Sequence, residues 1–295
     1  MPGVPVTKGE ARMSWIFCLL LALMLIPGAL TLVFYLLWYY DRRAFPSPTP
    51  ADRDAPLRPL PALLAVAREA VSLTVLVLSY PLRLVQDASP QRSRQQGQKP
   101  IILVHGYGGN STNFLWLQWW LRRRGWANVY SVSYTPPHIN ARKLAQQVAD
   151  HVDRILALTG AEKADLVCHS MGGPLVRYAL KNLGLAGKVD RVITLGSPHR
   201  GSRISALFAP RGAAAQMRYD SPFVKELEEG GVCPGGARYQ VIYSTMDNFI
   251  LPASSALLDG AERTVHVPYL GHCALLYSRR VARAVAEGLQ DETMR

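Results

Sequence analysis

The stretch DLVCHSMGGPLVRYAL, residues 165–180, joins a short apolar run, a turn of small residues and a helix-forming segment. The run DLVC predicts a buried β-strand, and a helix is expected from about Gly173. Pro174 suits the first turn of that helix, where its missing N–H costs nothing. The serine between them matches the nucleophile elbow G-x-S-x-G, with Cys168 in place of the first glycine. Ser170 is therefore expected to project above a sheet edge, and the alternative is a helix-capping serine in an ordinary turn.

Short β-branched runs alternate with longer helical segments from Lys99 onward. Strands are expected at IILV (101–104), VYSVSY (129–134), DLVC (165–168), RVITLG (191–196), YQVIYS (239–244) and TVHV (264–267). Helices are expected at Ser111–Arg124, at Asn140–Leu158, from about Gly173 and at about Ala274–Leu289. This alternation predicts βαβ units, and hence an α/β fold with a mostly parallel sheet covered on both faces. Residues 100–295 are expected to form one domain with its ligand site at the carboxyl ends of the strands.

A base and an orienting acid are expected to follow a serine nucleophile in the chain order Ser, Asp, His. Asp247 lies just past the strand YQVIYS, whereas the rival carboxylates Asp220 and Asp259 do not directly follow a strand. His272 lies in the loop after the last predicted strand, and none of the other six histidines has this placement. In this interpretation His272 takes the proton of Ser170, and Asp247 fixes the tautomer of the imidazole.

A tetrahedral intermediate also needs N–H donors for its oxyanion. One expected donor is the backbone N–H of Met171, directly after the serine. The other candidate is Tyr107, in the Gly-rich turn VHGYGG (104–109) after the first strand of the domain. The rival interpretation of this turn is a phosphate-binding loop, but it lacks the G-x-G-x-x-G order and a P-loop lysine.

Five motifs together resemble the class 2 lipase family of the α/β-hydrolase superfamily, which includes small bacterial triacylglycerol lipases. They are VHGYGG (104–109), TGAEKADLVCHSMGGPLVRYALKNL (159–183), VITLGSPHRGS (192–202), YSTMDNFILP (243–252) and GHCALLYS (271–278). The resemblance covers about Pro100 to Leu289. It implies an α/β-hydrolase fold, the same triad and oxyanion donors, an acyl ester substrate, and no metal or organic cofactor. The chain departs from the smallest members by its 99 residues ahead of the domain and by a longer stretch at 200–238.

An N-terminal run from Ser14 to Tyr40 contains no charged side chain. It exceeds the roughly 20 apolar residues that cross a bilayer, and aromatic residues lie at both of its ends. A cleaved signal peptide is the alternative, but the run is too long for one and no clear cleavage site follows it. The sequence therefore predicts a 13-residue tail and a transmembrane helix over residues 14–40.

Residues 41–99 are expected to connect this anchor to the domain. A Pro-rich linker comes first, and an apolar segment follows from Leu60 to Leu84, interrupted by Arg68 and Glu69. Because such a charged pair is costly in lipid, the segment is predicted to lie on the membrane or to pack on the main domain. A second membrane span is the alternative.

A composition of 49% apolar and 18% charged residues excludes a disordered chain, and the net charge is +12. No basic stripe or binding motif indicates nucleic acid, so the basic residues are expected to meet anionic lipid headgroups or simply to be solvated. The four cysteines have no metal-binding spacing. A bridge between Cys233 and Cys273 is possible but does not follow from the sequence.

Two apolar features near the expected site each have more than one interpretation. Ser221–Leu227 predicts a short helix that ends at Gly230-Gly231 and forms either a lid or acyl-pocket wall, or a helix packed on the sheet. Four aromatic residues follow the Gly-rich turn and either pack in the core, line an acyl site or touch the bilayer: Phe114, Trp116, Trp119 and Trp120.

Together these patterns predict a membrane-anchored serine ester hydrolase of the lipase or carboxylesterase type, in the inner membrane of a bacterium. A phospholipase or lysophospholipase acting on membrane lipids, and a serine acyltransferase or thioesterase, are the alternatives with the same triad. A catalytically silent membrane adaptor is a third class. The side of the membrane that the domain faces and the oligomeric state stay open.

Overall fold

A computed structural model describes residues 8–45, 57–88, 95–207, 211–229, 231 and 233–290. Within the first two ranges, the side chains of residues 8–21, 23, 24 and 88 lie outside this description. The expected tail at 1–13 and the Pro-rich linker therefore fall largely outside the described residues. The first half of the expected anchor is described as backbone only.

Six parallel strands form one sheet in the order β2-β1-β3-β4-β5-β6, as the alternation of patterns predicts. The strands are β1 (Ile101–Val104), β2 (Val129–Val132), β3 (Ala164–His169), β4 (Val189–Leu195), β5 (Arg238–Tyr243) and β6 (Arg263–His266). Each overlaps the stretch expected from its β-branched run. The neighbouring interior strands β1 and β3 are buried along their whole length, which is why their sequences show no polar alternation. The predicted α/β-hydrolase architecture is confirmed.

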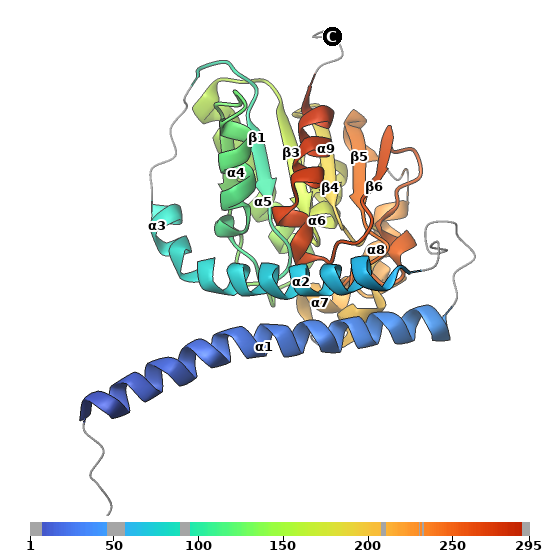
Figure 1. Ribbon diagram of the computed structural model, residues 1–295. Coiled ribbons are helices and arrows are strands. Elements are labelled where there is room, and N and C mark those ends of the chain that lie inside the picture. Colours follow the sequence, from blue (N-terminus) through green and yellow to red (C-terminus); the bar gives the residue numbers. More distant parts are fainter. Residues whose placement is uncertain are drawn as a thin grey trace, which may run out of the picture.

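Helices cover both faces of the sheet (Figure 1). On one face lie α5 (Ala141–Thr159) and α6 (Gly172–Asn182), and on the other lie α4 (Leu115–Arg122) and α9 (Arg279–Leu289). Shorter elements lie in the connections: η3 (Ser111–Phe114), η4 (Arg203–Leu207), α7 (Gly212–Gln216), α8 (Pro222–Glu228), η5 (Pro234–Gly236), η6 (Ala253–Ala256) and η7 (Cys273–Tyr277). Two apolar clusters, one on each side of the sheet, make the core.

Two further helices, α1 (Lys8–Ala44) and α2 (Pro59–Ser79), lie side by side beneath the carboxyl edge of the sheet (Figure 1). After α2 come η2 (Tyr80–Leu82) and α3 (Arg83–Ala88). The helix expected at 14–40 therefore exists, and it is longer at both ends. Helix α2 packs on the domain, one of the two arrangements expected for 60–84. Among the described residues, Pro59–Asp87 is long and apolar enough to cross a membrane.

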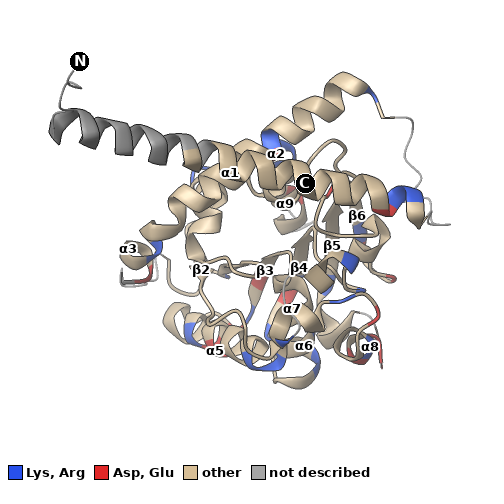
Figure 2. Cartoon of the chain, turned by 90° about the horizontal axis from the view of Figure 1, so that it is seen from below, with Lys and Arg blue, Asp and Glu red and all other residues tan. Residues whose placement is uncertain are grey.

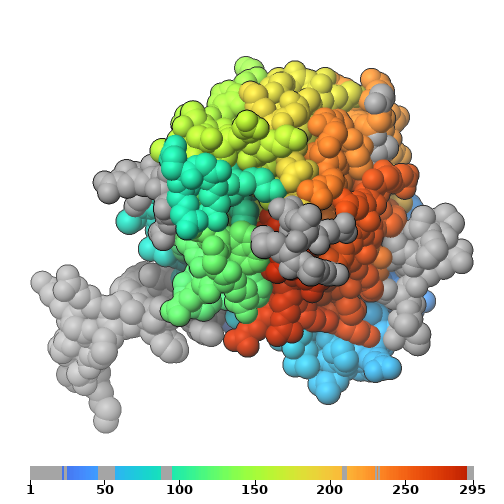
Figure 3. All heavy atoms as spheres, turned by 90° about the horizontal axis from the view of Figure 1, so that it is seen from above, coloured from blue at the N-terminus to red at the C-terminus, as the bar shows by residue number. Residues whose placement is uncertain are grey.

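On the opposite side of the molecule, at the amino ends of the strands, the surface is made mainly by the α/β domain and not by the helix pair (Figure 3). Figure 3 shows that segments of the α/β domain, coloured green to red, make most of the surface on this side. The helix pair is thus associated with one edge of the domain, the edge at which parallel α/β sheets bind ligands.

The structure distinguishes between the interpretations left open for Ser221–Leu227, for the aromatic residues and for the cysteines. Helix α8 begins after the N-cap Ser221 and buries Phe223 and Leu227 against α6, so it is a packing helix. Phe114 and Trp120 are core residues, whereas Trp119 is 53% exposed. The three cysteines whose side chains the structure describes are free thiols, so Cys233 and Cys273 are not bridged.

Candidate active site

Ser170 lies in the tight turn between β3 and α6. Its φ of +55° is in the left-handed region, which costs a non-glycine residue strain and typically marks functional positions. Its backbone N–H donates to the Leu195 carbonyl at 3.0 Å, which ties the turn to the end of β4. A Cβ at Gly172 would lie 2.7 Å from the Val104 carbonyl oxygen. The glycine two residues after the serine is therefore required by the close approach of β1.

Asp247 and His272 form a buried pair at the ends of neighbouring strands. The Nδ1 of His272 lies 3.0 and 2.9 Å from the two carboxylate oxygens of Asp247. The Oδ1 of Asp247 also accepts the N–H groups of Phe249 and Ile250, at 2.9 and 3.0 Å. These bonds fix the carboxylate in the loop after β5, so that it can hold one tautomer of the imidazole.

The charges around His272 alter its basicity. Burial disfavours the imidazolium, but the charge and hydrogen bond of Asp247, together with the charge of Glu69, outweigh burial and raise the pKa of His272. A raised pKa is what a proton acceptor needs in order to take the hydroxyl proton of a serine.

Three neighbours fix the imidazole of His272 in space. The side-chain oxygen of Asn248 accepts the His272 N–H at 3.1 Å. The ring of Phe249 stacks on the imidazole with centroids 5.0 Å apart, and the ring of His169 lies 4.5 Å away. The Nε2 of His169 is also 3.1 Å from the His272 carbonyl, and burial holds the pKa of His169 well below its usual value. None of these three roles was expected from the sequence, although Asn248 and Phe249 directly follow Asp247 and His169 directly precedes Ser170.

Ser170 and His272 line one cavity at the carboxyl edge of the sheet. Both expected oxyanion donors, Tyr107 and Met171, line the same cavity. Neither rival acid, Asp220 or Asp259, lines this cavity, and Asp259 pairs with Arg200 on the surface at 2.8 Å. The structure therefore brings together the five residues singled out from the sequence. Most of the remaining wall is apolar: Leu73, Leu76, Ile204, Ala214, Met217, Phe249 and Ile250.

Two cavity residues, Leu73 and Leu76, come from helix α2, outside the α/β domain. The sequence contained no signal that this helix reaches the site. From the stretch 200–238, the wall receives residues of η4 and α7, and α8 contributes none. No cluster of three or more His, Cys, Asp or Glu that could hold a metal occurs within the described part of the chain.

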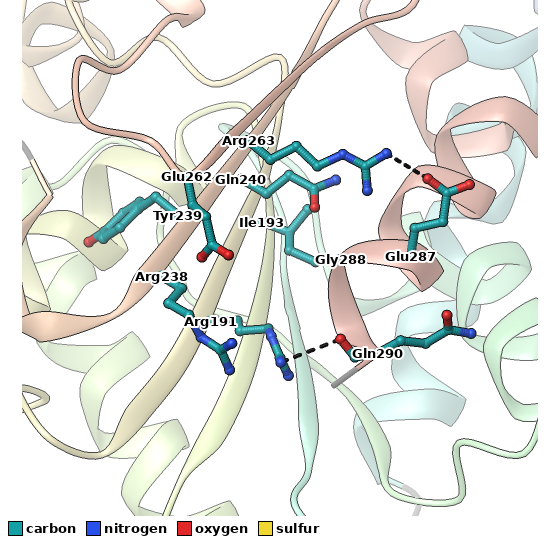
Figure 4. A pocket seen from close by; sticks show the side chains of 10 residues that line it. All are labelled: Arg191, Ile193, Arg238, Tyr239, Gln240, Glu262, Arg263, Glu287, Gly288 and Gln290. Atoms are coloured by element: carbon teal, nitrogen blue, oxygen red, sulfur yellow. Dashed lines mark hydrogen bonds and ion pairs between the residues drawn. The ribbon is translucent and has the colours of Figure 1, made fainter. Parts of the chain in front are cut away.

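A second cavity lies at the opposite, amino ends of β4, β5 and β6 (Figure 4). Its lining arginines are engaged in ion pairs: Arg263 binds Glu287 at 2.7 Å, and Arg238 binds Asp190 at 3.0 Å. It contains no histidine or serine. Of these two cavities, the one beside Ser170 is therefore suited to nucleophilic chemistry.

Comparison with known families agrees with this geometry. The model of the family described as "Lipase (class 2)" matches residues 98–270, more than half of the chain. The chain belongs to the class 2 lipase family. A triacylglycerol lipase of Vibrio cholerae is 34% identical over 44% of this chain and 43% of its own length. One from Burkholderia plantarii is 30% identical over 50% of this chain and 44% of its own. The alignments thus span less than half of these curated relatives.

Solved structures show the same fold at lower identity. The mature lipase BlEst2 of Bacillus licheniformis superimposes with a TM-score of 0.56 and 17% identity, over 68% of this chain and 95% of that chain. Lipase B of Aspergillus fumigatus gives a TM-score of 0.59 and 19% identity, over 81% of this chain and 59% of that one.

Proposed function

We propose that this chain is a lipase-like serine hydrolase of carboxylic esters, with Ser170 as nucleophile, His272 as base and Asp247 as orienting acid. The observation that carries the proposal is the buried Asp247–His272 pair in the same cavity as a serine held at φ +55°. A strained serine beside a base that a third group orients is the arrangement of nucleophilic catalysis. Family membership supports ester hydrolysis.

The reaction follows from the positions of these groups. His272 takes the hydroxyl proton as the Ser170 oxygen attacks the ester carbonyl, and the N–H groups of Tyr107 and Met171 receive the negative charge on the carbonyl oxygen. His272 then gives its proton to the alcohol that leaves. Water, deprotonated by His272, hydrolyses the acyl-serine and releases the acid. The strong bond from His272 Nδ1 to Asp247 keeps the other ring nitrogen available for each transfer.

The substrate is expected to carry an apolar acyl chain. Leu73, Leu76, Ile204 and Met217 border the cavity around the serine. Burying a side chain or acyl segment of this kind stabilises by about 0.8 kcal/mol per CH₂. Affinity should therefore increase with chain length until the cavity is filled.

The helix pair supports attachment to a membrane. The described outward faces of α1 and α2 are apolar and exposed, and Figure 2 shows few charges along them between their ends. Exposed apolar residues include Leu30, Leu32 and Leu36 on α1, and Leu60, Leu64, Val71, Val75 and Leu78 on α2. A helix that is apolar on its outer face as well is typical of a lipid environment. Because α2 also borders the cavity, phospholipid or lysophospholipid is the second candidate substrate.

Hydrolysis of a chain-length series of glycerol esters and phospholipids by wild type and Ser170→Ala tests the proposal. We expect wild type to cleave long-chain esters and to react with a fluorophosphonate at Ser170, and Ser170→Ala to do neither. Ser131→Ala is the matched control, since this buried hydroxyl in β2 has no hydrogen-bond partner among the described residues. If Ser170→Ala retains full activity, the mechanism is wrong; if phospholipids exceed glycerol esters in kcat/KM, the second substrate class is correct.

A further inference from the structure

The apolar helix α2 contains one buried carboxylate, and this carboxylate contacts the loop that bears His272. The side chain of Glu69 is 1% exposed, whereas the adjacent Arg68 lies at the surface. The charged pair that interrupts the apolar run therefore splits between the two faces of the helix. Burying a carboxylate is costly unless hydrogen bonds compensate, so the partners of Glu69 matter.

Each oxygen of Glu69 accepts one backbone N–H from the segment after His272. The N–H of Cys273 donates to one oxygen at 2.9 Å, and the N–H of Ala274 donates to the other at 2.8 Å. These residues begin η7, for which His272 is the N-cap. N–H groups in the first turn of a helix have no partner within the helix, so the carboxylate satisfies both.

The residue on the other side of His272 is fitted to the same carboxylate. A Cβ at Gly271 would collide with the Glu69 side chain. The backbone on both sides of the histidine is thus shaped around a residue that precedes it by about 200 positions.

We propose that Glu69 is a positioning residue for the reaction, which holds the His272 loop through the N–H groups of Cys273 and Ala274 and thereby makes α2 part of the active site. This inference rests on the proposed function. It assigns to the helix pair, which lies ahead of the family-matched residues 98–270, a role beyond attachment to a membrane.

Besides its hydrogen bonds to the backbone that follows His272, Glu69 interacts electrostatically with the imidazole of His272. Three titratable groups face the imidazole: Asp247 from the loop after β5, Glu69 from α2 and His169 from β3. Tyr35 of α1 and Cys273 in turn interact with Glu69. Burial raises the pKa of Glu69, and the two backbone N–H donors and the charge of His272 oppose that rise. When Glu69 is ionised it is one of the charges that raise the pKa of His272, so its replacement by a neutral group should move the pKa of His272 downward.

Glu69→Gln in the full-length chain tests the proposal. The amide can accept only one of the two N–H groups and turns its own NH₂ toward the other, so the loop should shift. We expect kcat to fall by about ten- to a hundredfold, the range for a small misplacement of a catalytic group, with KM little changed. We also expect the acid limb of the kcat/KM profile to move to lower pH.

Two variants separate positioning from stability. Ser72→Ala changes the same buried stripe of α2 one turn further along and should leave kcat and the acid limb as in wild type. Glu69→Asp keeps the charge but is shorter, so it should lower kcat while the acid limb stays in place. Each rate is divided by the fraction of Ser170 that a fluorophosphonate labels, so that unfolded protein is not counted. If Glu69→Gln does not fold, the kcat of Glu69→Asp decides the result.

The inference is wrong if the Glu69 variants have the same kcat as wild type, per serine labelled, whatever their thermal stability. This outcome is distinct from failure of the proposed function. If the proposed function is wrong, wild type itself would neither cleave esters nor be labelled at Ser170.

Discussion

Helices α5 and α2 both cover the α/β domain, yet they place polar and apolar residues on opposite faces. The outward face of α5 includes Lys143, Gln146, Asp150 and Arg154, and its buried face is aliphatic and small. The outward face of α2 is aliphatic, and its buried stripe contains Glu69 and Ser72. Helix α5 is thus built for water, and α2 for an apolar surrounding.

The same inversion holds for α1, and its inward polar groups reach the active-site loops. Asp41 binds Arg203 of η4 with both oxygens at 3.0 Å. The indole N–H of Trp38 donates to the carbonyl of Thr245, two residues before Asp247, at 3.0 Å. A helix pair that served as a tether alone would not need these bonds. The comparison supports the two proposals made above, that the inward groups hold the active-site loops and that the outward groups face lipid.

The largest expected effect lies inside the domain. Asp247→Asn removes the charge that orients His272, so kcat should fall by about 10⁴-fold, the size found when a triad acid becomes an amide. Stopped or continuous ester assays across pH measure it. Substitutions in α1 and α2 should lower kcat by less than this, so the loss in Asp247→Asn is the upper limit with which they are compared.

The pH dependence of wild-type activity tests the electrostatic role of Asp247 without a substitution. Because the pKa of His272 is raised, activity should decline below a pH that lies above the ordinary histidine value of about 6.5. The same shift stabilises the fold fully below about pH 6.5, and this contribution is lost as pH rises through the raised pKa. An acid limb at or below the ordinary value would contradict the electrostatic role of Asp247.

Much of the domain could be predicted because its information is local. Each strand is a short β-branched run, and parallel strands bring their carboxyl ends to one edge, so residues just after strands converge. Ser170, Asp247 and His272 could be grouped on that basis without any contact information. Their catalytic roles stay a prediction until activity is measured.

The contribution of α2 could not be predicted, because periodicity indicates which face is buried and not what covers it. Glu69 meets the N–H of Cys273 across 204 positions of sequence. Its only local signal was an Arg-Glu pair in an apolar run, which equally fitted a membrane surface. The same limit applies to Ser221–Leu227, for which a lid and a packed helix were both open: its helix signals are good, yet the residues that 200–238 contributes to the cavity wall come from η4, α7 and Met217 instead.

The outward faces of the two helices can be compared directly by their chemical accessibility. In native membranes, Val75→Cys on α2 should react with a water-soluble maleimide at least about tenfold more slowly than Ala157→Cys on α5, because thiolate hardly forms in hydrocarbon. Labelling of wild type is subtracted to account for native thiols. The difference should disappear when detergent micelles are diluted to expose the helix.

Equal rates in membranes would show that α2 does not meet lipid. Protection that persists in diluted, monomeric protein would instead indicate that another protein surface covers Val75.

The smallest expected effect concerns the inward face of α1. Trp38→Phe keeps most of the buried ring but removes the N–H that Thr245 accepts, so unfolding should cost about 1 kcal/mol less, and kcat should fall a few-fold at most. Tyr39→Phe, on the exposed side of the same turn, is the matched control and should change neither quantity. Thermal unfolding followed by circular dichroism, with ester turnover on the same samples, measures both. If the two variants lose stability equally, the bond to Thr245 contributes nothing. If Trp38→Phe lowers kcat without lowering stability, the α1 bond acts on the Asp247 loop itself, and both helices then belong to the active site.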